Sequence, residues 1–257
     1  MSFSQSSIIT SRKAALVAGL SILLMAILAG FAYGFVLQSL VIPNDAPLTV
    51  HNIRASMMLF RAGICSFLIV LILDVLVAWA LYVFFEQENK NLSMLAAWLR
   101  LVYSTILGVA LLNLIFVVLL LSGTNDLAIF EVSQLNAIVS LFLKAFNSIW
   151  SIGLVVFGCH LFVVGYLAFT SVYISKIFGF LLIIASVCYI TSNFANLLLP
   201  NYEKYKATVE LFISLPMIVG ELGFGLWLLF KGGKHLKYHK NGTIMIYKTE
   251  SKTIFAN

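Results

Sequence analysis

The stretch MMLFRAGICSFLIVLILDVLVAWALYVFF, from Met57 to Phe85, decides the fold class of this chain. It exceeds the roughly 20 consecutive apolar residues that a helix needs to cross the hydrocarbon core of a bilayer. Only Arg61 and Asp74 bring charge into it. This length and composition predict a transmembrane helix.

The composition of the whole chain points the same way. Of its 257 residues, 61% are hydrophobic and 10% are charged, whereas a soluble domain carries about 25% charged residues. A membrane β-barrel would show segments of about ten residues with alternating polarity, and this chain shows long unbroken apolar runs instead. We therefore expect an all-α, polytopic transmembrane bundle.

The apolar runs predict six spans in a single domain, residues 1–232. The spans cover about 14–40, 57–85, 92–121, 148–169, 177–199 and 208–230. The first apolar run is longer than that of a typical signal peptide, so we expect an uncleaved helix. Residues 233–257 form a basic tail, which we expect to be loosely ordered.

Three polar segments connect or interrupt the expected spans. In the link 42–56, Pro43 and Pro47 are expected to block helix formation. Residues 86–91 (EQENKN) predict a short polar turn. The amphipathic stretch 137–150 is interrupted by Lys144 and Asn147, and it would either lie in the membrane interface or extend the fourth span outward.

The distribution of lysine and arginine predicts the orientation in the membrane. With six spans, the side that holds both termini carries Arg12, Lys13, Lys90, Lys176, Lys231, Lys234, Lys237 and Lys240. The opposite side carries Arg54, Lys144, Lys204 and Lys206, with Arg61 near its boundary. Basic residues accumulate in the cytoplasm, so both termini are expected there. The basic tail then serves topology, and no nucleic-acid partner is expected.

Ionisable residues inside the spans are the candidate site. They are Asp74, Arg100, His160 and Glu221, with Asn113, Asn193 and Tyr189 as polar neighbours. Such groups cost free energy in a bilayer and need a partner or a purpose. From the helical rise, Asp74, His160 and Glu221 should all lie about 15 Å below the cytoplasmic face, in one polar layer. Arg100 is the expected counter-ion of Asp74 or Glu221.

Motifs for known chemistries are missing from the sequence. No HExxH or similar spacing occurs, and His235 and His239 stand in a lysine-rich tail, so no metal site is expected. No GxSxG elbow or GxxxxGK[ST] loop occurs either, and no cofactor is expected. Cys65, Cys159 and Cys188 lie in apolar spans and are expected to serve packing.

Three functions remain open. The favoured one is a non-catalytic membrane component, in which the polar layer only fixes helix packing. The alternatives are a small transporter that uses Asp74, His160 and Glu221, and an intramembrane enzyme acting on a lipid or isoprenoid. Gly220, Gly223 and Gly225 permit close helix approach or a pocket. Small-residue faces on the first and last spans are compatible with a homo-oligomer in the lipid bilayer.

Four blocks of the chain are familiar. These are Val41–Phe85, Asn89–Leu114, Val156–Ile190 and Gly220–Gly232, which contain, in order, FR, LDV, LR, FGxHL, GYL and GEL. They resemble a bacterial family of integral membrane proteins known only as domain of unknown function 4386. Members often carry a proline where this chain reads SVYISKIFG. The resemblance implies a multi-pass bacterial membrane protein and supplies no activity. We expect the protein in a bacterial inner membrane.

Overall fold

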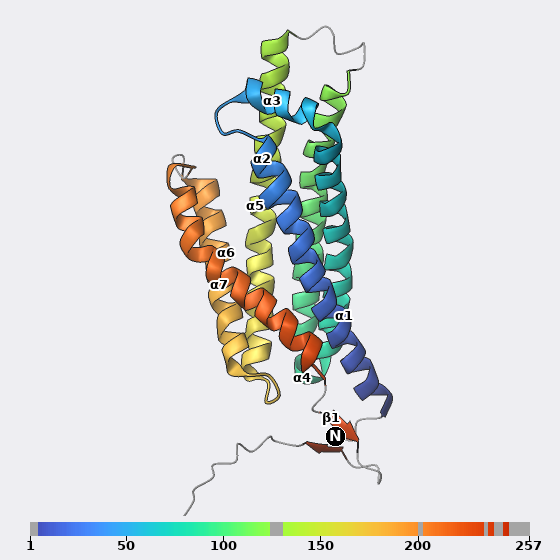
Figure 1. The fold of residues 1–257 in the computed structure, drawn as a ribbon. Helices are drawn as coiled ribbons and strands as arrows, with labels where there is room; N and C mark the ends of the chain where they lie inside the picture. The colour runs from blue at the N-terminus through green and yellow to red at the C-terminus, as the bar shows by residue number, and fades with distance from the viewer. Residues whose placement is uncertain (1–4, 124–130, 200–202, 234–235, 239–243, 247–257) are drawn as a thin grey trace, which may run out of the picture.

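The computed structural model describes residues 5–123, 131–199, 203–233, 236–238 and 244–246. Its helices are α1 (Gln5–Ala29), the π-helix η1 (Gly30–Leu37), α2 (Gln38–Leu40), α3 (Ala46–Ala55), α4 (Met57–Leu121), α5 (Val132–Thr170), α6 (Lys176–Leu198) and α7 (Glu203–Phe230), and two short strands follow, β1 (Leu236–Tyr238) and β2 (Ile244–Ile246) (Figure 1). The predicted all-α, polytopic bundle is confirmed. Four helices are long and apolar enough to cross a membrane, and residues Ser214–Phe230 of α7 form a shorter apolar helix.

A single kink divides α4 into two spans. Asn89 has φ −156° and ψ 104°, outside the helical region. Its side-chain oxygen accepts a hydrogen bond from the backbone N–H of Leu92 (3.1 Å), and so caps the second half of the helix. The polar turn expected at 86–91 is therefore reduced to one residue, and the bundle has six apolar segments.

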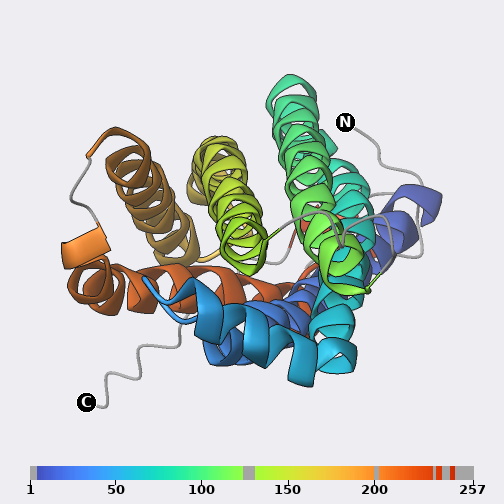
Figure 2. The same cartoon turned by 90° about the horizontal axis from the view of Figure 1, so that it is seen from above.

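These segments form a closed ring. α1 packs on α4, the second half of α4 on α5, α5 on α6, α6 on α7, and α7 back on α1. Seen from above, α4, α5 and α6 stand side by side, while α7 and α1 run along the other side (Figure 2). Side chains that point inward from all six segments therefore face a common centre.

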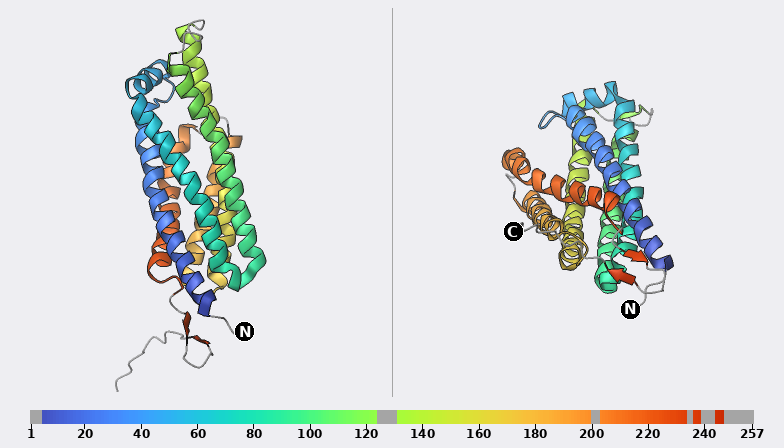
Figure 3. Two further views of the ribbon diagram at one scale, coloured as in Figure 1. Left: turned by 90° about the vertical axis from the view of Figure 1, so that its right-hand side faces the viewer. Right: turned by 60° about the horizontal axis from the view of Figure 1, so that its bottom comes forward.

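The link between the first two spans contains a helix, so the prediction of a helix-free link was wrong. Pro47 lies in the first turn of α3, where its missing N–H would have had no helical partner. Asp45 caps this helix by accepting a hydrogen bond from Leu48 N–H (2.9 Å). α3 lies at the end of the bundle opposite to β1 and β2 (Figure 3).

The amphipathic stretch 137–150 is part of α5, so the outward extension is confirmed and the separate interfacial helix was wrong. α5 has 39 residues, which gives a length of about 58 Å. The hydrocarbon core is only about 30 Å thick. A helix of this length cannot lie wholly within the hydrocarbon core, and α5 packs on α3.

Glycines allow neighbouring helices to approach closely. A Cβ added at Gly19 of α1 would lie 2.7 Å from the carbonyl oxygen of Gly225 in α7, and one at Gly179 of α6 would lie 2.5 Å from the backbone nitrogen of Phe169 in α5. Small residues bring backbones together in this way in membrane bundles. The small-residue faces of the first and last spans thus contact each other within one chain.

The tail contains one ordered element that we did not expect. β1 and β2 pair antiparallel, with Leu236 opposite Ile246. Strand-forming residues such as Tyr238, Ile244 and Ile246 in the sequence could have predicted these strands. Most of the remaining tail, including His235 and His239, lies outside the described residues.

Candidate functional site: a buried cluster at the centre of the bundle

An ion pair joins the two halves of α4. Nη2 of Arg100 lies 2.7 Å from Oδ1 of Asp74, and these side chains are 4% and 0% exposed. Of the two acidic partners expected for Arg100, the structure selects Asp74, and no ion pair links Arg100 to Glu221 among the described residues. The kink at Asn89 makes the pairing possible because it folds the two halves of α4 against each other.

His160 of α5 completes this cluster with both ring nitrogens engaged. Nε2 lies 3.1 Å from Nη1 of Arg100, and Nδ1 lies 2.8 Å from the carbonyl oxygen of Ala96. A guanidinium can only donate and a carbonyl can only accept. His160 therefore carries its single proton on Nδ1 and is neutral in this arrangement.

The charges of Asp74, Arg100 and His160 balance, but the hydrogen bonding of these three side chains is incomplete. One carboxylate faces one guanidinium, and the imidazole adds no charge. Both carboxylate oxygens of Asp74 and Nε of Arg100 are buried without an aligned hydrogen-bond partner. The 2.7 Å contact between Asp74 and Arg100 is therefore held by charge attraction more than by hydrogen-bond geometry, at the cost of desolvating both groups.

Phe157 connects this cluster to a second polar pair. The Arg100 guanidinium lies 5.3 Å from the centre of the Phe157 ring, within cation–π range, and the His160 ring stacks on Phe157 at 5.7 Å. Tyr189 of α6 meets the same ring edge-on at 5.2 Å. The Tyr189 hydroxyl donates a 2.7 Å hydrogen bond to Glu221 of α7. Glu221 therefore shares the layer without joining the ion pair.

All six spans contribute to this centre. Met25 of α1 places its sulfur 3.9 Å from Nη2 of Arg100. The members of the central cluster are Met25, Asp74, Arg100, Phe157, His160, Tyr189 and Glu221. Sequence reasoning missed Met25 and Phe157. Phe157 precedes His160 by three residues, so the helical period would place it on the same face.

The other polar residues in the spans lie outside the cluster. Asn113 and Asn193 donate to carbonyls of their own helices, Ala110 (3.1 Å) and Tyr189 (2.9 Å). Arg61 is exposed and donates to the Ser122 hydroxyl (3.3 Å). The three cysteines are unpaired, and the described residues contain no group of three His, Cys, Asp or Glu side chains that could hold a metal ion.

Arg12, which the sequence analysis counted only among the basic residues that predict membrane orientation, also has a structural role. Its guanidinium donates to three carbonyls at the carboxyl end of α7: Gly232 (2.6 Å), Leu229 (2.9 Å) and Leu228 (3.2 Å). The last carbonyls of a helix have no helical partner and carry partial negative charge. Arg12 therefore caps the last helix from the first and holds the ring closed at that end.

Residues 17–232 match the family model described as domain of unknown function 4386. The chain belongs to this family. A relative in Archaeoglobus fulgidus, named only as an uncharacterized protein, is 32% identical over 172 residues, which cover 67% of this chain and 85% of that relative. No solved structure matches the chain. This member of the family is a multi-pass membrane protein, and neither the family description nor its relative carries an activity.

Proposed function

We propose that the chain is a non-catalytic component of a prokaryotic cell membrane, such as a bacterial inner membrane, and that its central cluster fixes how six spans pack. One observation carries this proposal. The guanidinium of Arg100 is contacted by Asp74 from the other half of α4, by His160 and Phe157 from α5, and by Met25 from α1. A single buried cation thereby ties three other spans to its own.

Catalysis by His160 fits this arrangement poorly. A general base needs a free ring nitrogen within reach of a substrate proton. Both nitrogens of His160 are hydrogen-bonded within the protein, and the side chain is 1% exposed. These contacts make an intramembrane enzyme centred on His160 the weakest of the three functions.

A small transporter for a cation, or for protons with a solute, is the second candidate. It is favoured by the position of Asp74, whose carboxylate is fully buried among the spans beside Arg100. Ionisable residues at such depth in membrane proteins mark candidate ion or proton pathways. The Tyr189–Glu221 pair would supply a second group of polar side chains in the same layer, to which the ion or proton could bind.

Both termini are proposed to face the cytoplasm. Arg12 and Gly232 touch, so the two ends of the bundle lie on one side. That side also carries Lys13, Lys90, Lys176 and Lys231, as the positive-inside rule requires of a cytoplasmic face.

Folded yield in detergent, measured by size-exclusion chromatography, tests the packing function. Asp74→Asn and His160→Ala should each reduce the monodisperse fraction strongly, because the first leaves the buried charge of Arg100 uncompensated and the second removes the acceptor of its Nη1. Glu221→Gln should reduce it less, since the Tyr189 hydroxyl keeps an acceptor. His51→Ala, at an exposed position of α3, is the matched control.

If the Asp74 and His160 variants fold as well as the control, packing is not the task of the cluster. The transporter candidate then gains support. It would be tested in proteoliposomes by ion or proton flux, which Asp74→Asn should abolish.

A further inference from the structure

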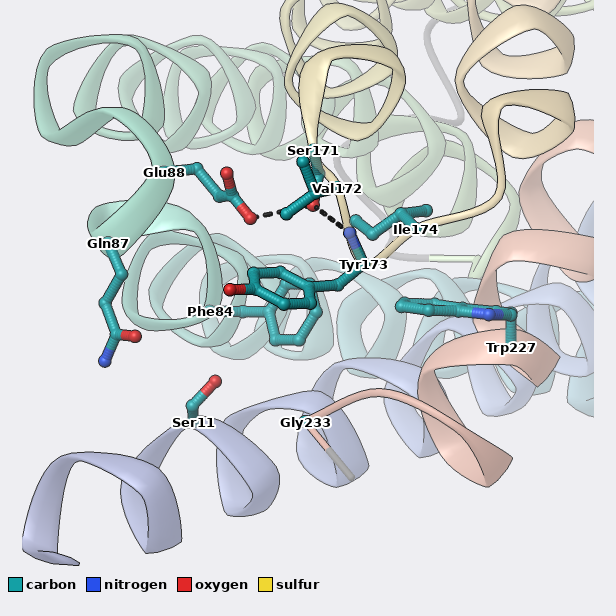
Figure 4. A pocket seen from close by; sticks show the side chains of 10 residues that line it. All are labelled: Ser11, Phe84, Gln87, Glu88, Ser171, Val172, Tyr173, Ile174, Trp227 and Gly233. Carbon is teal, nitrogen blue, oxygen red and sulfur yellow. Dashed lines mark hydrogen bonds between the residues drawn. The ribbon is translucent and has the colours of Figure 1, made fainter. Parts of the chain in front are cut away.

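A pocket of about 200 Å³ opens at the end of the bundle that carries the Asn89 kink. Four segments line it: the start of α1, the end of the first half of α4, the turn between α5 and α6, and the end of α7. Figure 4 shows these side chains around the cavity. The pocket shares no residue with the central cluster.

Aromatic rings form much of its wall. Phe84, Tyr173 and Trp227 all line the cavity, and Trp227 is held in place by ring contacts with Phe84 at 6.3 Å and with Phe224 and Phe178. The faces of aromatic rings attract cations, and several rings together form the sites that recognise quaternary ammonium groups.

One carboxylate is positioned at this wall. Glu88 accepts a 2.7 Å hydrogen bond from the Ser171 hydroxyl, whose oxygen in turn accepts from the backbone N–H of Tyr173 (3.2 Å) (Figure 4). Within the described part of the chain, no lysine or arginine forms an ion pair with Glu88. Burial, together with the nearby charge of Glu88, raises the pKa of the Tyr173 phenol above its usual range.

Helix ends add to the negative potential. The first half of α4 ends at the Asn89 kink and α5 ends at Thr170, and Glu88 and Ser171, next to these two ends, line the pocket. The carboxyl end of a helix carries partial negative charge. The carbonyls at the end of α7 are already paired with Arg12, so α7 adds little to this potential.

We propose that this pocket binds a small organic ammonium group, held against Phe84, Tyr173 and Trp227 and paired with Glu88. The cavity is smaller than the roughly 300–1,000 Å³ of sites for drug-sized ligands, so it suits a head group or a simple amine. The same chemistry is offered by the ethanolamine head of a membrane lipid and by a free amine in solution.

The test titrates purified protein with choline and ethanolamine and measures binding by isothermal titration calorimetry. A neutral analogue of choline, 3,3-dimethylbutan-1-ol, is the ligand control. Glu88→Gln should weaken cation binding about two- to fivefold, a loss typical of a solvent-exposed ion pair. Glu86→Gln, two residues earlier and outside the pocket lining, is the matched control and should leave binding unchanged.

A second arm distinguishes the source of the ammonium group. The protein is reconstituted in nanodiscs of phosphatidylethanolamine or of phosphatidylglycerol, and lipids retained after extraction are counted by native mass spectrometry. Binding of the soluble cations identifies a free-amine site. Retention of phosphatidylethanolamine alone, lost in Glu88→Gln, identifies a lipid head-group site.

Two results would overturn the proposal. In one, neither arm shows binding that depends on positive charge, so that the neutral analogue or phosphatidylglycerol binds equally well. In the other, Glu88→Gln and Glu86→Gln bind alike. Because Glu88 is exposed, the variant should fold, and a Trp227→Leu variant, titrated by the same calorimetry, provides an independent check that the aromatic wall contributes to binding.

Discussion

Arg12 donates a 2.6 Å hydrogen bond to the carbonyl oxygen of Gly232, 220 residues further along the chain. This contact joins the first and last spans at one end of the bundle, where Gly19 and Gly225 already bring α1 and α7 close together. The ring of six spans is therefore closed by backbone proximity and by a cation on the last carbonyls of α7.

Replacing Arg12 with alanine should lower the stability of the bundle by about 1–3 kcal/mol, since three carbonyls lose a charged donor. Thermal unfolding in detergent, followed by circular dichroism, measures the change. Lys13→Ala, one residue further and exposed, should change the midpoint little. Equal effects of the two substitutions would mean that Arg12 contributes only charge and not the cap.

The Asp74–Arg100 pair should behave as a coupled unit. Asp74→Leu and Arg100→Met alone should each cost about 3–5 kcal/mol, because each leaves an uncompensated buried charge. The double variant should recover much of that loss, since both charges are removed together. A double-mutant cycle on unfolding free energies measures the coupling, and additive costs would contradict the ion pair.

Gly179→Ala should destabilise the α5–α6 contact by about 1–3 kcal/mol through overpacking, since the new Cβ would meet the backbone of Phe169. Gly34→Ala is the control, because no atom lies within 4 Å of the Cβ it would add. That substitution should be neutral or stabilise the protein by up to about 1 kcal/mol. Equal melting temperatures for the two variants would argue against tight packing at Gly179.

Reporter fusions test the orientation. Green fluorescent protein joined to the carboxyl terminus should fluoresce, as it does when folded in the cytoplasm, because the basic residues of that side favour retention there. Alkaline phosphatase inserted in the link 124–130 should be active, since this enzyme needs the oxidising space outside the cell membrane. The reverse pattern would show that both termini lie outside.

Much of the central cluster followed from simple depth arithmetic. Asp74 and His160 stand in different spans at similar distances from the same membrane face, and the rise of a helix places them at one level. Arg100 was expected to neutralise an acidic residue, but its partner depended on which helix faces meet. That choice is made by the rotation of the two halves of α4, which hydropathy does not report.

Other features required three-dimensional knowledge or a better use of local rules. The position of Pro47 after Asp45 is a helix-start signal, so α3 could have been predicted. Arg12 could not have been assigned its role, because the contact with Gly232 spans almost the whole chain and depends on the closure of the ring. Phe157 looked like one more apolar residue, and only its neighbours show that it bridges two polar pairs.

At Asn89 the two halves of α4 are joined by one non-helical residue. Each residue added to a helix turns everything after it by about 100°, and there is no flexible loop here to absorb the change. One inserted residue after Asn89 would therefore swing Arg100 away from Asp74 and toward lipid. Formation of the central cluster therefore depends on the length of this turn more than on its composition.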